Sequence, residues 1–370
     1  MQKLKSKIKV SVLGATGMVG QRFILLLNNH PWFEIIDIAA SKKSENKSYE
    51  EAVKNKWVMS EPVPDNIKYL TLRNVNDLKS MPKKVKVVFS AVDLSEKQET
   101  RKFEFRYAKE GYAVISTSSA NRKSPDVPML IPEINHNHLD ILKVQQKNHS
   151  LPNSGFVVVK PNCSIQSYVF VLDALQKANY PINKVQVNTL QALSGAGYKA
   201  INSAQYKKNI IPYIHGEEEK TEIEPTKIFG SIKNNEIINN DDIQISATCT
   251  RVPIIDGHTA IVYISFKDRR PSMLEFENIL NSYISLPQIL KLPSAPLKPI
   301  HVLNETDRPQ PKIDLNRDSG MGLSIGRVQK DLFFDIRFIG LSHNTIRGAA
   351  GGAILNAELI FKNDFIDNSG

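Results

Sequence analysis

Cysteine is scarce in this sequence: only Cys163 and Cys249 occur among 370 residues. Two cysteines cannot build the disulfide framework of a secreted domain, which favours a reducing compartment. No apolar run reaches the ~18 residues that cross a bilayer. The basic start leads directly into a strand pattern, without the apolar stretch and cleavage site of a signal peptide. We therefore expect a cytoplasmic protein with no membrane partner.

Acidic residues are outnumbered, with 38 Asp and Glu against 48 Lys and Arg, for a formal net charge of +10. A basic surface can attract nucleic acid. The basic residues are scattered, however, and the densest stretch, at 42–47, is interrupted by acid and lacks interleaved aromatic residues. A small anionic ligand or solubility explains the excess, and we expect no nucleic-acid partner. A zinc pattern is missing too, so we expect no metal.

The length favours two domains, because a single core stops growing near this size. Strand and helix patterns alternate at first, then long strands cluster from residue 156 onward. The alternation predicts an α/β fold with an N-terminal Rossmann-type doubly wound parallel sheet, residues 1–158. The clustered strands predict a C-terminal α+β domain with a largely antiparallel sheet, residues 159–344. The predicted strands are 8–13, 33–40, 85–91, 113–116, 157–159, 184–192, 244–252, 258–266 and 332–341, and the predicted helices are 21–29, 96–109 and 166–178.

Two further segments complete the second half. Residues 286–311 are rich in proline, which predicts an extended surface segment. The stretch 345–361 carries apolar residues at helical spacing after a glycine-rich turn. We expect this C-terminal part, 345–370, to pack back on the first domain.

A glycine turn follows the first strand, with Gly14, Gly17 and Gly20 at three-residue spacing. Glycines there allow a sharp turn and close approach to a pyrophosphate at a helix N-terminus. A tight structural turn is the alternative, although the strand before and the helix after favour a dinucleotide. The second strand ends in Ser41-Lys42-Lys43, where an NAD site would carry an acid. Hydroxyl and ammonium groups suit a 2′-phosphate, so NADP is the expected cofactor.

Cys163 lies between a buried strand and a helix in Pro161-Asn-Cys-Ser164. A thiol at a helix N-terminus is favoured as thiolate, which suggests a covalent thioester route. Cys249, in an alternating strand, is interpreted as an inert packed residue. The Asp256-Gly257 pair predicts a hairpin that brings Arg251 and His258 to the same end of the sheet. There the guanidinium could clamp a carboxylate and the imidazole could act as acid or base, although a structural histidine is equally plausible.

Three more polar segments stay ambiguous on this reasoning. The acidic cluster 217–220 reads first as an exposed helical face. The glycines at 195–197 suit a close approach of backbone to ligand, and 342–348 could supply polar contacts or a helix cap. Together the residues indicate an NADP-linked aldehyde or acyl oxidoreductase with the substrate open.

The whole set of motifs resembles the aspartate-semialdehyde dehydrogenases, particularly their archaeal and fungal branch. The resemblance covers nearly the whole chain in seven ordered segments: 14–20, 161–164, 190–197, 210–220, 251–259, 308–311 and 343–350. It implies NADPH-dependent reductive dephosphorylation of L-aspartyl-4-phosphate to L-aspartate 4-semialdehyde, in the aspartate pathway to lysine, threonine and methionine. The family usually forms homodimers through the second domain, sometimes paired into homotetramers.

The resemblance also implies residue roles. Cys163 would be the nucleophile, His258 the acid and base, and Gln191 would orient the thioester. The implied substrate-binding residues are Arg251 for the α-carboxylate, Glu217 for the α-ammonium, Lys220 and Arg122 for the phosphate, and Asn162 for the oxyanion. The implied cofactor-binding residues are Gly14, Thr16, Gly17, Met18, Val19, Gly20, Ser41, Lys43, Ser90, Ser194, Gly195, Asn344 and Thr345.

Two other functions remain open at this point. Malonyl-CoA reductase shares the fold and the cysteine but lacks the Glu-Glu-x-Lys cluster, which this chain keeps at 217–220. A non-catalytic NADP-binding regulator would lack a nucleophile or a base, and both are present. Departures from the family pattern occur at His215 and Thr117, and Glu218 could exchange roles with Glu217.

Overall fold

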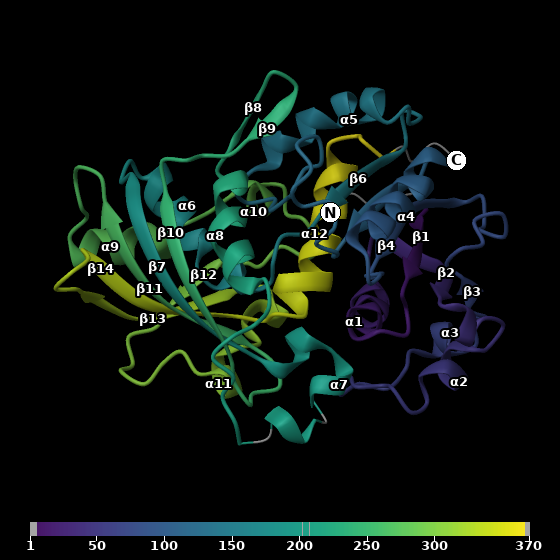
Figure 1. The fold of residues 1–370 in the computed structure, drawn as a ribbon, viewed down its shortest axis with the longest axis horizontal. Coiled ribbons are helices and arrows are strands. Elements are labelled where there is room, and N and C mark those ends of the chain that lie inside the picture. Colours follow the sequence, from purple (N-terminus) through teal and green to yellow (C-terminus); the bar gives the residue numbers. More distant parts are fainter. Residues whose placement is uncertain (1–5, 202, 207, 367–370) are drawn as a thin grey trace.

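The computed structural model describes residues 6–201, 203–206 and 208–366. Two six-stranded sheets form two lobes (Figure 1). In the first lobe every strand pairs in parallel, in the order β3-β2-β1-β4-β5-β6. This order is that of a Rossmann fold and confirms the predicted sheet. Its strands are β1 (Ile8–Leu13), β2 (Phe33–Ala40), β3 (Arg73–Asn74), β4 (Val85–Ser90), β5 (Ala113–Ser116) and β6 (Phe156–Val159).

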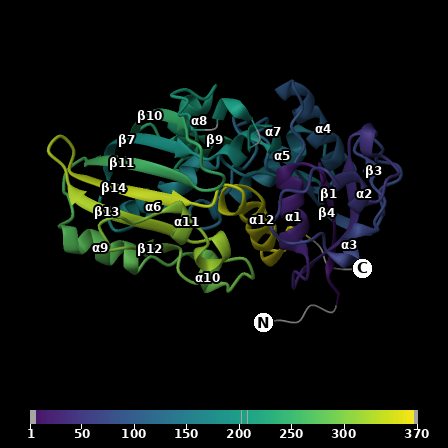
Figure 2. The same cartoon turned by 90° about the horizontal axis from the view of Figure 1, so that it is seen from below.

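Helices cover both faces of the parallel sheet. On one face, α1 (Met18–Leu27) and α12 (Gly351–Lys362) share an apolar cluster with β1 and β2. On the other face, α4 (Lys97–Lys109) packs against β5 and β6. Figure 2 shows α12 between the two lobes. The C-terminal helix therefore packs on the first sheet, and the boundaries at residues 158 and 344 stay a prediction.

The second sheet is mixed, in the order β10-β7-β11-β14-β13-β12. The pairs β10–β7 and β12–β13 are parallel, and the other three are antiparallel. Helices α6 (Val169–Lys177) and α9 (Met273–Asn281) bury apolar side chains against it. Its strands are β7 (Ile182–Gln191), β10 (Gln244–Arg251), β11 (His258–Phe266), β12 (Ile300–Val302), β13 (Leu323–Lys330) and β14 (Ile336–Ser342).

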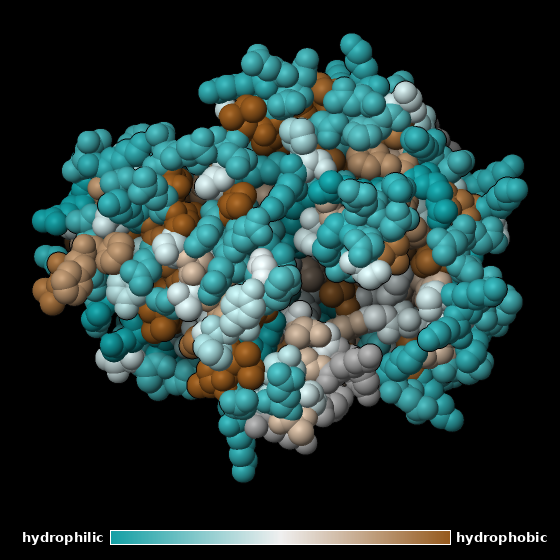
Figure 3. Space-filling model, viewed as in Figure 1, coloured by the Kyte–Doolittle hydropathy of each residue, from teal (hydrophilic) through white to brown (hydrophobic). Residues whose placement is uncertain are grey.

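Further elements connect these layers. They are α2 (Tyr49–Val53), α3 (Asp65–Lys68), α5 (Leu142–Asn148), α7 (Tyr198–Ile201), α8 (Glu217–Ile228), β8 (Ser231–Lys233), β9 (Glu236–Ile238), α10 (Leu286–Ile289) and α11 (Pro311–Asp314). Among the described residues, no helix is long and apolar enough to cross a membrane. Figure 3 shows a mainly hydrophilic face that is hollowed where the two lobes meet.

Three local predictions are wrong. The predicted hairpin between β10 and β11 does not form, because β7 lies between these strands and pairs with both. The last long strand begins at Ile336 rather than at Leu332, which is 95% exposed in the preceding turn. The proline-rich segment is not simply extended, since it contains α10 and the strand β12, which pairs with β13.

Candidate active site

Three strand ends bring polar side chains to one edge of the mixed sheet. Gln191 ends β7 and Arg251 ends β10, and these two residues are partners in the parallel register. His258 begins β11, which runs antiparallel to β7 and therefore starts at the same edge. Arg251 and His258 thus meet as predicted, although through a shared neighbouring strand and not through a hairpin.

Cys163 and His258 are in direct contact. The Sγ atom of Cys163 lies 3.3 Å from Nε2 of His258. Nδ1 of the same ring accepts a hydrogen bond of 3.0 Å from the main-chain N–H of Ala192. Because a main-chain N–H can only donate, the neutral ring carries its proton on Nε2. Burial, with the nearby Arg251 guanidinium, lowers the pKa of His258 to about 3. The imidazole is therefore neutral and donates towards the sulfur.

The thiol is not activated as the sequence suggested. Cys163 precedes a single 3₁₀ turn, Ser164–Ser167, and the α-helix begins only at Val169. Burial, and then the negative charge of Glu217, raises the pKa of Cys163 to about 11. The predicted dipole-stabilised thiolate is wrong, because one 3₁₀ turn offers little aligned dipole and desolvation dominates. Arg122 and Arg251 oppose the increase in this pKa.

Glu217, the first residue of α8, connects the other polar groups. Its Oε2 accepts hydrogen bonds from Asn162 at 2.9 Å and from Gln191 at 3.3 Å. Its Oε1 accepts one from Lys220 at 2.7 Å. Burial alone would raise the pKa of Glu217, but the Lys220 ammonium and the amide donors lower it to about 2. A permanent carboxylate therefore lies beside the thiol.

Glu218 faces away from this network. Its Oε1 accepts a hydrogen bond of 3.1 Å from the main-chain N–H of Cys249 in β10. Cys249 itself is fully buried, which agrees with its interpretation as a packed residue. Of the two neighbouring glutamates, Glu217 is the one that lies among the site residues.

The sequence reasoning missed Glu224. Its Oε1 accepts a hydrogen bond of 2.8 Å from Nη1 of Arg122, and its Oε2 accepts one of 2.5 Å from the main-chain N–H of Asn162. Nη2 of Arg122 also donates to the carbonyl oxygen of Thr117, at 3.1 Å. Glu224 lies seven residues, or about two helical turns, after Glu217, and this spacing could have placed both on one face of α8.

Several of the predicted site residues line a cavity of about 290 Å³ between the lobes. Ten predicted residues border it: Val19, Arg122, Asn162, Cys163, Ser194, Gly195, Glu217, Lys220, Asn344 and Thr345. Gln191, Arg251 and His258 adjoin these residues through the contacts described above and through Gly195. An ideal Cβ on Gly195 would lie 3.1 Å from both Nη1 of Arg251 and Cε1 of His258. Glycine therefore leaves room for both side chains, and a Cβ would force them to shift by a few tenths of an ångström.

The turn after β1 has the shape that a dinucleotide requires. Gly14 has φ +73°, and a Cβ on Gly20 would come 2.2 Å from the carbonyl oxygen of Gly14. Helix α1 starts at Met18, after Thr16 and Gly17, so its free N–H groups face the carboxyl edge of the parallel sheet. Ser90, the last residue of β4, is buried, and its Oγ has no hydrogen-bond partner among the described residues.

The end of β2 fits a 2′-phosphate. Ser41 precedes a short 3₁₀ helix that carries Lys42 and Lys43, and both lysines are exposed. Asp37, the nearest acid within the strand, is buried and paired with Arg73 at 2.8 Å. Ser41 and Lys43 do not border the cavity around Cys163, as expected if they contact the distant end of an extended dinucleotide. Among the described residues there is no group of three or more metal-ligating side chains.

Comparison with known proteins supports this architecture. Residues 9–142 match the family model for the semialdehyde dehydrogenase NAD binding domain, and residues 172–347 match the one for the semialdehyde dehydrogenase dimerisation domain. A curated relative, aspartate-semialdehyde dehydrogenase of Archaeoglobus fulgidus, is 42% identical and aligns over 97% of this chain and 100% of its own. The Saccharomyces cerevisiae enzyme of the same name is 40% identical over 96% and 98%.

A solved structure has a similar fold over nearly the whole chain. The crystal structure of aspartate semialdehyde dehydrogenase with NADP from Candida albicans has a TM-score of 0.87 and 37% identity, covering 98% of this chain and 100% of that one. A Rossmann lobe joined to a cysteine site on a mixed sheet defines a dehydrogenase of the semialdehyde type. The chain belongs to the aspartate-semialdehyde dehydrogenase family.

Proposed function

We propose that the protein reduces L-aspartyl-4-phosphate to L-aspartate 4-semialdehyde with NADPH and releases phosphate, in the aspartate pathway to lysine, threonine and methionine. The observation that carries this proposal is the 3.3 Å contact between Cys163 and His258 in a cavity that also holds the Glu217–Lys220 pair. A thiol beside an imidazole is suited to acyl transfer through a thioester. A carboxylate and an ammonium group can bind the α-ammonium group and the phosphate of an amino acid that carries an acyl phosphate.

Cys163 is the nucleophile in this scheme. Its sulfur attacks the acyl carbon, the bond from carbon to the phosphate oxygen breaks, and the thiol proton passes to the departing phosphate. A thioester remains on Cys163. NADPH, when bound to the first lobe, would supply the hydride that reduces the thioester carbonyl. The thiohemiacetal then collapses, the C–S bond breaks, and the aldehyde is released. Nε2–H of His258 donates to the oxygen or sulfur that bears negative charge. The main-chain N–H of Cys163 supports the oxyanion, whereas that of Asn162, which was expected to share this role, already donates to Oε2 of Glu224.

Each charged residue of the site is assigned to one part of the substrate. Arg251 is placed to hold the α-carboxylate and Glu217 the α-ammonium, while Gln191 orients the thioester. Lys220 and Arg122 hold the phosphate. This division distinguishes the proposed reaction from malonyl-CoA reduction, whose substrate has neither an α-ammonium group nor an acyl phosphate.

The fit of NADP depends on residues of the first lobe. Thr16, Met18 and Val19 offer main-chain N–H groups to the pyrophosphate, while that of Gly17 donates to the carbonyl oxygen of Gly14 and shapes the turn. The hydroxyl of Ser90, which has no partner among the described residues, lies at the end of the neighbouring strand β4. Ser41 and Lys43 would bind the 2′-phosphate. Ser194 and Asn344, joined by a hydrogen bond of 2.7 Å, would hold the nicotinamide end with Thr345.

The dimerisation-domain match and the two cysteines bear on the assembly and the location of the protein. The match of residues 172–347 to a dimerisation domain supports a homodimer, which sedimentation would distinguish from a homotetramer. Both cysteines are free. A mechanism that needs a free thiol suits a reducing cytoplasm.

The test is the reverse reaction: NADPH formation from aspartate semialdehyde, NADP and phosphate, with Cys163→Ala beside Cys249→Ala as the matched control. We expect turnover that requires phosphate, is retained in Cys249→Ala and falls at least on the order of 10³-fold in Cys163→Ala. NADPH oxidation with malonyl-CoA and no activity on the semialdehyde would reassign the substrate. NADP binding without turnover on either substrate would support the non-catalytic regulator.

A further inference from the structure

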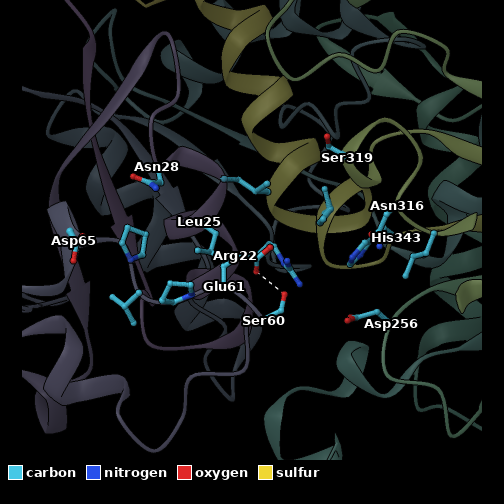
Figure 4. Close-up of a pocket in the computed structure, with 16 residues that line it drawn as sticks. Arg22, Leu25, Asn28, Ser60, Glu61, Asp65, Asp256, Asn316, Ser319 and His343 are labelled. Atoms are coloured by element: carbon cyan, nitrogen blue, oxygen red, sulfur yellow. Dashed lines mark hydrogen bonds between the residues drawn. The ribbon is translucent and has the colours of Figure 1, made fainter. Parts of the chain in front are cut away.

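A second cavity, of about 790 Å³, lies between the lobes on the flank of α1. One wall consists of α1 and the segment 60–65 of the first lobe, and the other wall comes from Asp256, Asn316, Ser319 and His343 of the second. Figure 4 shows the Arg22 side chain extending from α1 towards His343 and Asp256. None of the residues assigned above to substrate or dinucleotide lines this cavity.

We propose that this cavity binds a small zwitterion, an α-amino acid with an apolar side chain. Its volume lies within the range of small-molecule sites, which combine an apolar lining with a few polar groups. Leu25, Leu315 and Ile346 supply the apolar part, and Arg22 and Asp256 supply opposite charges on opposite walls.

Arg22 is the anchor for a carboxylate. Its Nε is buried and has no hydrogen-bond partner among the described residues. A buried guanidinium donor without an acceptor is costly, and a carboxylate satisfies it with two parallel hydrogen bonds. Burial lowers the pKa of Arg22, and the negative charges of Asp256 and Glu61 oppose this decrease. The same carboxylates provide a counter-charge for the ammonium group of a zwitterion.

The wall opposite α1 carries local backbone strain. Asp318 and Ser319 adopt φ of +46° and +56°, and Ser319 faces the cavity. Consecutive left-handed conformations of residues other than glycine persist where the surroundings enforce them, and ligand clamps are one such place. Here the Asp318 side chain is fixed by the main-chain N–H of Leu297 and by His301.

The cavity is connected to the catalytic residues. Asp256 lies two residues before His258, and the N–H of the intervening Gly257 donates to Oδ1 of Asn344 at 2.9 Å. Asn344 in turn donates to Ser194 of the active site. Because the two walls belong to different lobes, an occupant would fix one lobe relative to the other beside the catalytic histidine.

The experiment is calorimetric titration of the full-length protein with α-amino acids from L-alanine to L-phenylalanine. N-acetyl-L-leucine, without the ammonium group, and 3-methylbutylamine, without the carboxylate, are the matched ligands. We expect a saturable signal for at least one apolar amino acid and none for the two analogues. Arg22→Met and Asp256→Asn should each weaken binding at least about tenfold. Arg270→Met, at an exposed arginine elsewhere, should bind as the unmodified protein does.

The proposal would be overturned by three results: no binding of any apolar amino acid, equal binding of N-acetyl-L-leucine, or unchanged affinity in Arg22→Met. Thermal melting establishes that each variant folds. If Arg22→Met does not fold, Asp256→Asn decides, since it keeps the shape of the side chain and removes only its charge.

Discussion

The main-chain N–H of Ala192 donates to Nδ1 of His258 and thereby fixes which nitrogen of the ring faces Cys163. With Nδ1 occupied as an acceptor, the proton of the neutral ring lies on Nε2, next to the sulfur. The end of β7, which supplies Gln191, therefore also orients the ring of His258 through the next residue, Ala192.

The first prediction concerns the charge of His258. Because burial lowers its pKa to about 3, the ring should stay neutral, as the Nε2–H tautomer, from about pH 5 to about pH 9. Nitrogen-15 NMR of the labelled imidazole, assigned with His258→Gln, would report the tautomer and the titration. A titration near the ordinary histidine value would contradict the prediction.

The second prediction concerns the thiol. Since the pKa of Cys163 is raised to about 11, alkylation by iodoacetamide should accelerate about tenfold per pH unit through the neutral range. Glu217→Gln removes a negative charge that raises this pKa, so the rate near pH 8 should increase. The measurement uses a Cys249→Ala background, with Glu218→Gln as the matched control. A plateau already present below about pH 8 would argue against a thiol that is neutral in this range.

The third prediction concerns Gly195. An added methyl group would come within 3.1 Å of both Arg251 and His258 and displace them. Gly195→Ala should therefore reduce kcat about 10- to 100-fold, because small misplacements of catalytic groups are costly. The melting temperature should stay close to that of the unmodified protein, since the residue is exposed. Ala196→Ser, in the same exposed turn, is the control, and equal kcat values for both variants would contradict the argument.

The fourth prediction concerns Glu224 as a positioning residue. It bonds to Arg122 and to the main chain of Asn162, so Glu224→Gln should loosen the phosphate end of the site. We expect KM for phosphate to increase by about tenfold, with a smaller change in kcat, because one charge-assisted contact is weakened. Glu219→Gln removes an exposed ion pair with Lys123 and should change KM little. A fall in kcat alone would assign Glu224 another role.

The fifth prediction concerns stability. Burial raises the pKa of Glu104 from 4.5 to about 7, although Ser116 and Asn121 donate to it. The folded state then binds this proton more tightly than the unfolded chain, so stability decreases as pH rises from about 4.5 to about 7. Glu104→Gln keeps the shape of the side chain, and because the amide does not titrate, this variant should not lose stability between pH 4.5 and about 7. Its advantage should be small near pH 4 and on the order of 3 kcal/mol at pH 8, measured by urea unfolding.

Glu110→Gln, an exposed glutamate at the end of the same helix, is the control for Glu104 and should show no such dependence. A pH-independent difference between Glu104→Gln and the unmodified protein would show that the buried carboxyl does not titrate in this window.

Local pattern determined much of this protein. The alternation of 8–13, 33–40, 85–91 and 113–116 with helical segments predicted the parallel sheet, because a buried β-strand and an amphipathic helix have different apolar periods. The Gly14–Gly20 turn and the Pro161–Ser164 segment identified the dinucleotide turn and the thiol, since each depends on a few adjacent residues. Four predicted strands, at 8–13, 33–40, 113–116 and 258–266, have the same ends in the structure.

Contacts between distant residues could be decided only by the tertiary structure. The strand β7 pairs with both β10 and β11 although it lies more than 50 residues before them along the chain, so the local Asp256-Gly257 signal predicted the wrong partner. The pKa of Cys163 depends on burial and on Glu217, 54 positions away along the chain. Glu224, the tautomer of His258 and the cavity beside Arg22 arise from packing between elements. The sequence specified the local chemistry, and the folded chain set the electrostatic environment in which that chemistry operates, because desolvation and charge act through space.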